Sequence, residues 1–295
     1  MPSVQQNLEL WNQTYSWSQA GDEWSSAWGG TDWMWWTSIY PRIYRFLPAR
    51  TILEIAPGHG RFTKCLKEYC DRMIIVDLSP RCIEACRERF AADSHISYHV
   101  NDGRSLDMVP DRSVDFVFSF DSLVHADAEV MHAYVRQIAR KLTDTGWGFL
   151  HHSNLGSYRR NASFARYFNK VKPLGRALTK AGLLVSPSWR ADDMTADLFD
   201  DFCQKSGLQC VSQELINWGN YRSLIDSISV FRTGNGSRLP RKVIRNSGFM
   251  NEVEKCRLRA EALSNQPELR ASVPLAPVSL QSEGHSNRKS GSVRA

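Results

Sequence analysis

The stretch that most constrains the fold is Thr51 to Gly60, which reads TILEIAPGHG. Its apolar run over 52–55 is typical of a strand buried on both faces. Gly58 and Gly60 then allow a tight turn and a close approach of the backbone to a ligand. The next residues, RFTKCLKEYC, predict a helix over about 61–70. A strand, a glycine turn and a helix in this order build the ligand site of an open α/β sheet.

The same alternation continues along the chain. Further apolar runs predict strands over 72–78, 96–100, 114–120, 146–153, 208–219 and 223–233. Helices are expected between them over 79–92, 127–142 and 192–207. Strand–helix units with short connections form parallel sheets covered on both faces. We therefore predict an α/β fold with a doubly wound, mainly parallel seven-stranded sheet, whose last strand is antiparallel.

Composition divides the chain into three parts. Residues 1–50 hold seven of the ten tryptophans and predict a helical N-terminal lid. Residues 51–234 carry the strand–helix pattern, interrupted over 155–190 by a basic and aromatic insertion. Residues 235–295 have 11 Lys and Arg against 5 Asp and Glu. We expect this last part to be a largely disordered basic tail with a short helix over 249–263.

Charge and cysteine content exclude several classes of protein. The formal net charge is +6, but it lies in the tail and the insertion, so the remaining body is acidic and does not favour a nucleic-acid-binding core. No apolar run reaches the roughly 20 residues that span a bilayer. The seven cysteines are scattered without a CxxC pair. We expect a cytoplasmic protein with reduced thiols and no metal site.

The glycine turn also indicates the kind of ligand. A dinucleotide site of the NAD type needs a third glycine three residues after Gly60, but Thr63 stands there. Glu54, just before the turn, would repel a pyrophosphate. A ligand with a positively charged group beside the turn explains this carboxylate better. S-adenosylmethionine is such a ligand, because it carries an ammonium and a sulfonium.

In this region, LEIAPGHGR resembles the first motif of the class I S-adenosylmethionine-dependent methyltransferases, with Ala56 in place of the first glycine. The resemblance covers about residues 45–155. It implies that Asp77 holds the ribose hydroxyls and that Asp102 contacts the adenine amino group. Capping of the helix that begins at Pro80, and a plain Asn-Asp-Gly turn, are the alternative roles of these two aspartates. The resemblance assigns the cofactor to Glu54, Ala56, Gly58, Gly60, Asp77, Leu78, Asp102, Gly103 and Phe120.

A hydroxyl acceptor must lose a proton during methyl transfer, so we looked for a base beyond the strand ends. His125 is the first candidate, because it lies on the loop after the fourth core strand, where Asp121 or Asp127 would orient it. His152 is the second candidate, since it ends the fifth strand. His151 would then point to the opposite face.

The tryptophan-rich segment has two interpretations. Its indoles either pack the first helix onto the sheet or form a lid whose aromatic faces stack on sugar rings. For the lid, we expect Trp17, Glu23 and Trp24 to lie nearest the acceptor.

We therefore expect a methyltransferase that acts on a hydroxyl of a small or glycan-type acceptor. The insertion over 155–190 suggests an anionic, phosphate-linked acceptor, peripheral contact with a membrane surface, or only a solvated cover. Nothing indicates a nucleic-acid partner. The alternatives are methylation of nitrogen or carbon in another metabolite, an NAD-dependent oxidoreductase, and a non-catalytic binding protein of the same fold. The oligomeric state cannot be derived from the sequence.

Overall fold

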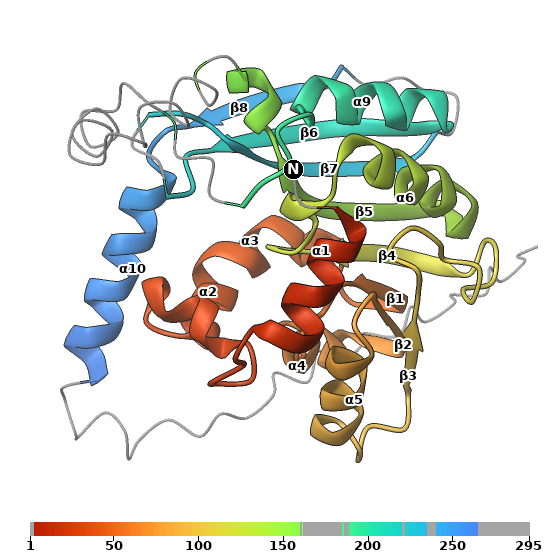
Figure 1. Ribbon diagram of the computed structural model, residues 1–295, viewed down its shortest axis with the longest axis horizontal. Coiled ribbons are helices and arrows are strands. Elements are labelled where there is room, and N and C mark those ends of the chain that lie inside the picture. Colours follow the sequence, from red (N-terminus) through yellow and green to blue (C-terminus); the bar gives the residue numbers. More distant parts are fainter. Residues whose placement is uncertain are drawn as a thin grey trace, which may run out of the picture.

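An eight-stranded sheet forms the centre of the protein (Figure 1). This computed structural model describes residues 3–159, 161, 185, 189–219, 222–234 and 240–264. The strand order is β3-β2-β1-β4-β5-β7-β6-β8. The strands are β1 Ala49–Ile55, β2 Cys70–Asp77, β3 Ile96–Val100, β4 Val114–Ser119, β5 Leu142–Ser153, β6 Leu208–Ile216, β7 Asp226–Thr233 and β8 Lys242–Asn246.

The sheet is mainly parallel, and β7 runs antiparallel to both of its neighbours, β5 and β6. The expected α/β class with a mainly parallel sheet is confirmed. The α-helices are α1 Val4–Glu9, α2 Thr31–Met34, α3 Tyr40–Ile43, α4 Thr63–Leu66, α5 Pro80–Arg89, α6 Ala128–Lys141, α9 Ala196–Lys205 and α10 Phe249–Ser264.

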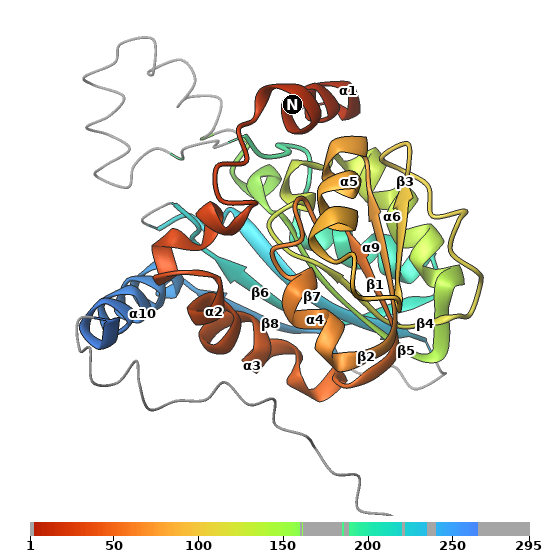
Figure 2. The ribbon, with the colours of Figure 1, turned by 90° about the horizontal axis from the view of Figure 1, so that it is seen from below.

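Helices cover both faces of the sheet (Figure 2), and a hydrophobic core lies beneath each cover. One core joins the sheet to α6 and α9, and the other joins it to α2, α3, α4, α5 and α10. Successive residues of a strand point to opposite faces. In β1, Leu53 and Ile55 belong to the first core and Ile52 belongs to the second. Burial on both faces explains why these three positions of the strand are all large aliphatic residues.

The N-terminal segment crosses the edge of the sheet at which the parallel strands end. Asn7, in α1, donates from Nδ2 to the carbonyl of His125 at 3.3 Å. Asn12 accepts at Oδ1 from the hydroxyl of Ser79 at 2.9 Å. The loops after β2 and β4 are therefore both hydrogen-bonded to this segment, which covers the C-terminal ends of these strands.

The chain beyond residue 235 differs from the expected tail. Lys242–Asn246 form β8, which pairs with β6, and α10 follows it. Every third or fourth residue of α10 is buried, namely Phe249, Val253, Cys256 and Ala260. The short helix expected over 249–263 is therefore present as α10, with its basic residues between the buried positions, whereas β8 was not expected. The sheet thus has one strand more than expected.

Part of the insertion and of the tail lies outside the described residues, including almost all of 160–188 and all of 265–295. The expected contacts of the insertion with an anionic acceptor or a membrane surface fall there. Within the part of the chain that is described, no helix combines the length and the apolar character needed to cross a membrane.

Candidate functional site

The glycine turn after β1 has the backbone that a ligand site requires. Ala56 and Gly58 both adopt left-handed conformations, with φ of 56° and 59°. A Cβ atom on Gly58 would lie 2.9 Å from the indole of Trp17, so the lid leaves room for glycine only. A Cβ atom on Gly60 would instead lie 2.4 Å from the ring of Phe90. Gly60 therefore serves packing against the end of α5.

Two buried carboxylates flank this turn. Asp77 accepts from the amide of Gly58 at 3.1 Å and from the amide of Ser79 at 2.8 Å. Glu54 accepts from the hydroxyl of Thr63 at 2.6 Å. Burial raises the pKa of Asp77 to about 6 and that of Glu54 to about 7. The hydrogen bonds to these carboxylates favour the ionised forms and lower both pKa values, but by less than burial raises them. A ligand with positive charge and hydroxyl groups would complete both sites.

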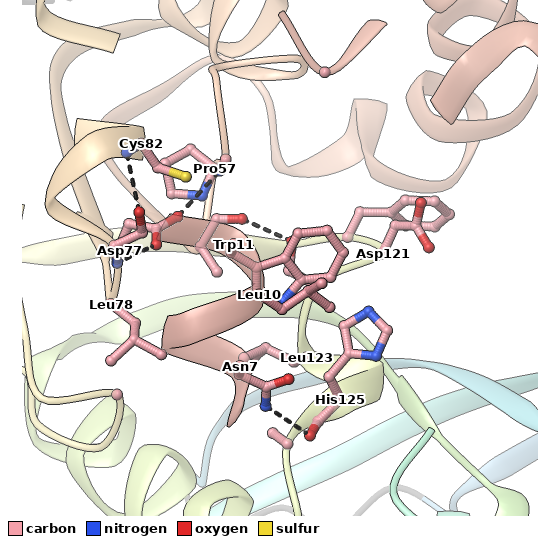
Figure 3. Close-up of a pocket in the computed structure, with 18 of the residues that line it drawn as sticks. Asn7, Leu10, Trp11, Pro57, Asp77, Leu78, Cys82, Asp121, Leu123 and His125 are labelled. Atoms are coloured by element: carbon pink, nitrogen blue, oxygen red, sulfur yellow. Dashed lines mark hydrogen bonds between the residues drawn. The ribbon is translucent and has the colours of Figure 1, made fainter. Parts of the chain in front are cut away.

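These carboxylates belong to a cavity of about 530 Å³ at the C-terminal edge of the sheet, a volume typical of small-molecule sites. Figure 3 shows Asp77 and Leu78 on one side of this pocket and Asp121 and His125 on the other, with Trp11 between them in that view. The sequence-predicted residues that line the cavity are Trp17, Trp24, Glu54, Ala56, Gly58, Asp77, Leu78, Gly103, Phe120, Asp121 and His125.

His125 has a defined tautomer in this cavity. Its Nδ1 is hydrogen-bonded to the carbonyl oxygen of Trp189, so Nδ1 carries the proton and Nε2 is left as an acceptor. Burial lowers the pKa of His125 to about 4, which keeps the ring neutral at physiological pH. The ring centroid lies 5.5 Å from that of Trp11. The residue is thus a neutral acceptor below an aromatic cover.

Asp121 pairs with a second pocket residue. Its Oδ2 lies 3.1 Å from a terminal nitrogen of Arg61, and both side chains are largely buried. The other terminal nitrogen of Arg61, NH1, has no hydrogen-bond partner among the described residues. The guanidinium therefore keeps donor capacity for a ligand.

Besides Gly60, three predicted residues do not line the cavity. His152 is wholly buried on the opposite face of β5, where its Nε2 lies 2.8 Å from the hydroxyl of Ser229 and its ring stacks on Phe199. It does not line the cavity, since the period of the strand turns it toward α9. Asp102 is exposed and closes its own turn by accepting from the amides of residues 104 and 105. Glu23 lies behind the cavity wall and accepts from the hydroxyl of Tyr15 at 3.1 Å.

Several lining residues were not predicted from the sequence. Arg61 directly follows the glycine turn, and that position was a usable signal. Trp218 lies in the connection between β6 and β7. A single aromatic residue in a connection belongs to no periodic pattern that would indicate its role. Tyr134 lies on the buried face of α6, so its position in the sequence looks like that of an ordinary core residue. Arg190 stands just beyond the insertion. Their spacing in the sequence contains no motif.

The comparisons with known proteins agree with this geometry. A family model described as a methyltransferase domain matches residues 52–146. The chain is 32% identical over 62 residues to an rRNA adenine N-6-methyltransferase of Streptomyces fradiae, which covers 21% of this chain and 19% of that protein. It is 39% identical over 57 residues to nodulation protein S of Sinorhizobium fredii, which covers 19% of this chain and 26% of that protein. The chain thus spans about a quarter or less of these two relatives.

The fold itself has solved counterparts. An S-adenosylmethionine-dependent methyltransferase of Leishmania major superposes with a TM-score of 0.51 and 11% identity, covering 78% of this chain and 82% of that one. At this identity the likeness concerns the fold. Residues 52–146 thus match a methyltransferase domain, and the fold around them is that of the class I, Rossmann-like S-adenosylmethionine-dependent methyltransferases, whose cofactor is S-adenosyl-L-methionine.

Proposed function

We propose that the protein methylates a hydroxyl group of a small, sugar-like acceptor and that His125 accepts the proton of that hydroxyl. The proposal depends on one observation above the others. A neutral histidine whose Nδ1 is committed to the carbonyl of Trp189 lines the same cavity as the two carboxylates of the cofactor side.

The cofactor half of the cavity fits S-adenosylmethionine. When bound, this cofactor supplies a methyl group on a positively charged sulfur. Glu54 would offset positive charge next to the turn, and Asp77 would bind the ribose hydroxyls. Both carboxylate oxygens of Asp77 already accept one backbone amide each, which fixes their orientation, and each keeps a lone pair for a hydroxyl.

The other half of the cavity combines aromatic faces with charged side chains. Aromatic rings pack against the apolar faces of sugars, while carboxylate and guanidinium groups bind hydroxyls. The aromatic residues that line this part are Trp11, Tyr15, Trp24, Phe120, Trp189 and Trp218. Arg61 and Asp121 supply the charged groups. This combination supports a polyhydroxylated acceptor.

His125 would act by accepting a proton at Nε2 as the acceptor oxygen is methylated. Its low pKa makes it a weak base that stays unprotonated over the working pH range. Much of the rate would then come from holding the acceptor in line with the methyl group. Phe120, Asp121 and Trp11 line the same cavity and would contribute to that alignment.

The first experiment is calorimetry with S-adenosylmethionine and, separately, NAD, on the native chain and on Asp77→Ala. We expect micromolar binding of S-adenosylmethionine that is lost in the variant, and no binding of NAD. Binding of NAD alone would instead support the oxidoreductase alternative.

The second experiment is a screen for release of S-adenosylhomocysteine with monosaccharides, methyl glycosides, sugar phosphates, simple amines and a short RNA. Turnover with a hydroxyl acceptor is expected. His125→Asn keeps an amide donor for the carbonyl of Trp189 but removes Nε2, so it should lower kcat by about 10²-fold or more and preserve cofactor affinity. Turnover only with amines or RNA would contradict the hydroxyl acceptor.

A further inference from the structure

Asp121 has a backbone conformation that needs support from its surroundings. Its φ is +66°, in the left-handed region that residues other than glycine rarely adopt. Strained residues of this kind persist only where neighbouring groups hold them, and they gather at functional sites. The support here comes from side chains that neither bind the cofactor nor serve as the base.

His151 holds the amide of Asp121. The N–H of Asp121 donates to Nδ1 of His151 at 3.2 Å. The imidazole has no exposed surface and lies between Phe120 and Trp218, with ring centroids 4.6 and 5.2 Å away. Because Nδ1 accepts, the proton of the neutral ring must be on Nε2.

The second ring nitrogen faces a buried ion pair. Nε2 of His151 lies 3.3 Å from Oδ2 of Asp226, and among the described residues it makes no hydrogen bond of good geometry, with Asp226 or with any other group. Arg190 binds both oxygens of Asp226, at 2.6 and 2.7 Å. Such bidentate pairs fix orientation as well as charge. The imidazole therefore accepts from the amide of Asp121 on one side and faces the fixed carboxylate of Asp226 on the other.

This array reaches the cavity at two points. Arg190 and Asp121 both line it. The carboxylate of Asp121 meets Arg61, whose NH1 has no partner within the described part of the chain. A buried ion pair such as Arg190–Asp226 adds little stability compared with apolar residues of the same shape. We therefore look for its role in the orientation of neighbouring groups.

We propose that the buried Arg190–Asp226–His151 array is a positioning device that holds Asp121 in its left-handed conformation. Asp121 and Arg61 then bind neighbouring hydroxyl groups of the acceptor as a fixed acceptor–donor pair. His151 acts through Asp121 and does not touch the substrate. This inference rests on the proposed function, because it assigns a role to these residues in acceptor binding.

Two matched substitutions separate positioning from packing. In His151→Asn, the side-chain oxygen takes the place of Nδ1, so the bond from the amide of Asp121 is kept and the contact with Asp226 is lost. In His151→Gln, the amide takes the place of Nε2, so the contact with Asp226 is kept and the bond from Asp121 is lost. Both variants replace the buried imidazole ring with a carboxamide side chain, so the loss of ring packing is similar in the two.

With the sugar acceptor that the screen identifies, we expect His151→Gln to raise the acceptor KM at least tenfold. His151→Asn keeps the bond from Asp121 but loses its anchor at Asp226, so it should raise the KM by a smaller factor, about three- to fivefold. The Kd of S-adenosylhomocysteine, measured by calorimetry, should stay within twofold in both, which shows that the fold and cofactor site persist. Equal acceptor KM values in the two variants would overturn the proposal.

A spectroscopic measurement tests the array independently of turnover. Long-range ¹H–¹⁵N correlation spectra of the wild-type protein should show an unprotonated Nδ1 and a protonated Nε2 for His151. A proton on Nδ1 would overturn the proposal, because that nitrogen could then not accept from Asp121. If the protein binds S-adenosylhomocysteine but methylates nothing in the screen, the proposed function fails and the tautomer alone decides on the array.

Discussion

At the scale of residues, the adenine contact expected of Asp102 has a structural alternative. Asp102 occupies the expected position in the sequence but is used by its own turn. Tyr134, in α6, is buried and lines the cavity. Its hydroxyl accepts from Nδ2 of Asn101 at 3.0 Å, which leaves the hydroxyl proton available for a ring nitrogen of the base.

We therefore expect Tyr134→Phe to weaken binding of S-adenosylhomocysteine about 5- to 20-fold, the usual effect of one lost hydrogen bond to a buried partner. The matched control is Asp102→Asn, which retains the side-chain oxygen that closes the turn and should change the affinity less than twofold. Calorimetry measures both. A large loss in Asp102→Asn with none in Tyr134→Phe would restore the assignment based on the motif.

The two carboxylates beside the turn make cofactor binding depend on pH. In the free protein, the pKa of Glu54 is about 7 and that of Asp77 about 6, both raised by burial. A cationic cofactor with ribose hydroxyls favours the ionised forms, so binding releases protons below these values. Affinity should therefore rise by about 10- to 100-fold from pH 5.5 to 7.5 and then level off.

Calorimetry in two buffers of different ionisation enthalpy measures this proton release. Glu54→Gln keeps an oxygen for the hydroxyl of Thr63 and removes the titration, so the step near pH 7 should disappear from the affinity profile. A wild-type profile that is flat from pH 5.5 to 7.5 would show that neither carboxylate changes its protonation on binding.

At the scale of elements, the strand–helix alternation could be predicted because each buried strand shows an apolar run that ends at a turn signal. The alternation of side chains along a strand also predicted that His151 and His152, in β5, point to opposite faces of the sheet. Which of the two faces the cavity depends on the pairing of β5 with β4 and β7 and on the packing of α9, none of which is local. The sequence therefore could not choose between them.

The N-terminal lid is the element with the most direct test. The indole of Trp17 stacks on the ring of His59 in the glycine turn, with centroids 4.2 Å apart and planes 13° apart. Trp17→Ala should therefore weaken S-adenosylhomocysteine binding about tenfold through a faster dissociation rate, as for other aromatic anchors. Trp36→Ala is the control, because Trp36 is 55% exposed and does not line the cavity.

Stopped-flow fluorescence gives the dissociation rates of both variants. A tighter complex in Trp17→Ala would mean that the indole competes with the cofactor for the turn. That result would make the segment an obstacle to binding instead of a cover.

At the scale of the whole molecule, the C-terminal elements β8 and α10 bring the end of the described chain into contact with its N-terminal segment. A Cβ atom on Gly29, at the end of the 3₁₀ segment Asp22–Trp28, would lie 2.4 Å from the Cβ of Ala260, so α10 packs closely on the lid. Phe249 stacks with Trp218 at 6.0 Å, and Trp218 lines the cavity. The C-terminal part therefore packs behind the cavity wall that includes Trp218. Composition placed it in a tail, because polar and basic residues outnumber the few that make contact.

This arrangement predicts that Phe249 matters for the stability of the entire fold. Phe249→Ala removes a ring that is 1% exposed and should lower the free energy of unfolding by about 3–5 kcal/mol. Leu258→Ala, on the exposed face of the same helix, should change it by less than 1 kcal/mol. Urea unfolding followed by tryptophan fluorescence compares them, since Trp28 and Trp218 both contact Phe249. Equal, small effects would mean that α10 is attached loosely and that the acceptor wall stands without it.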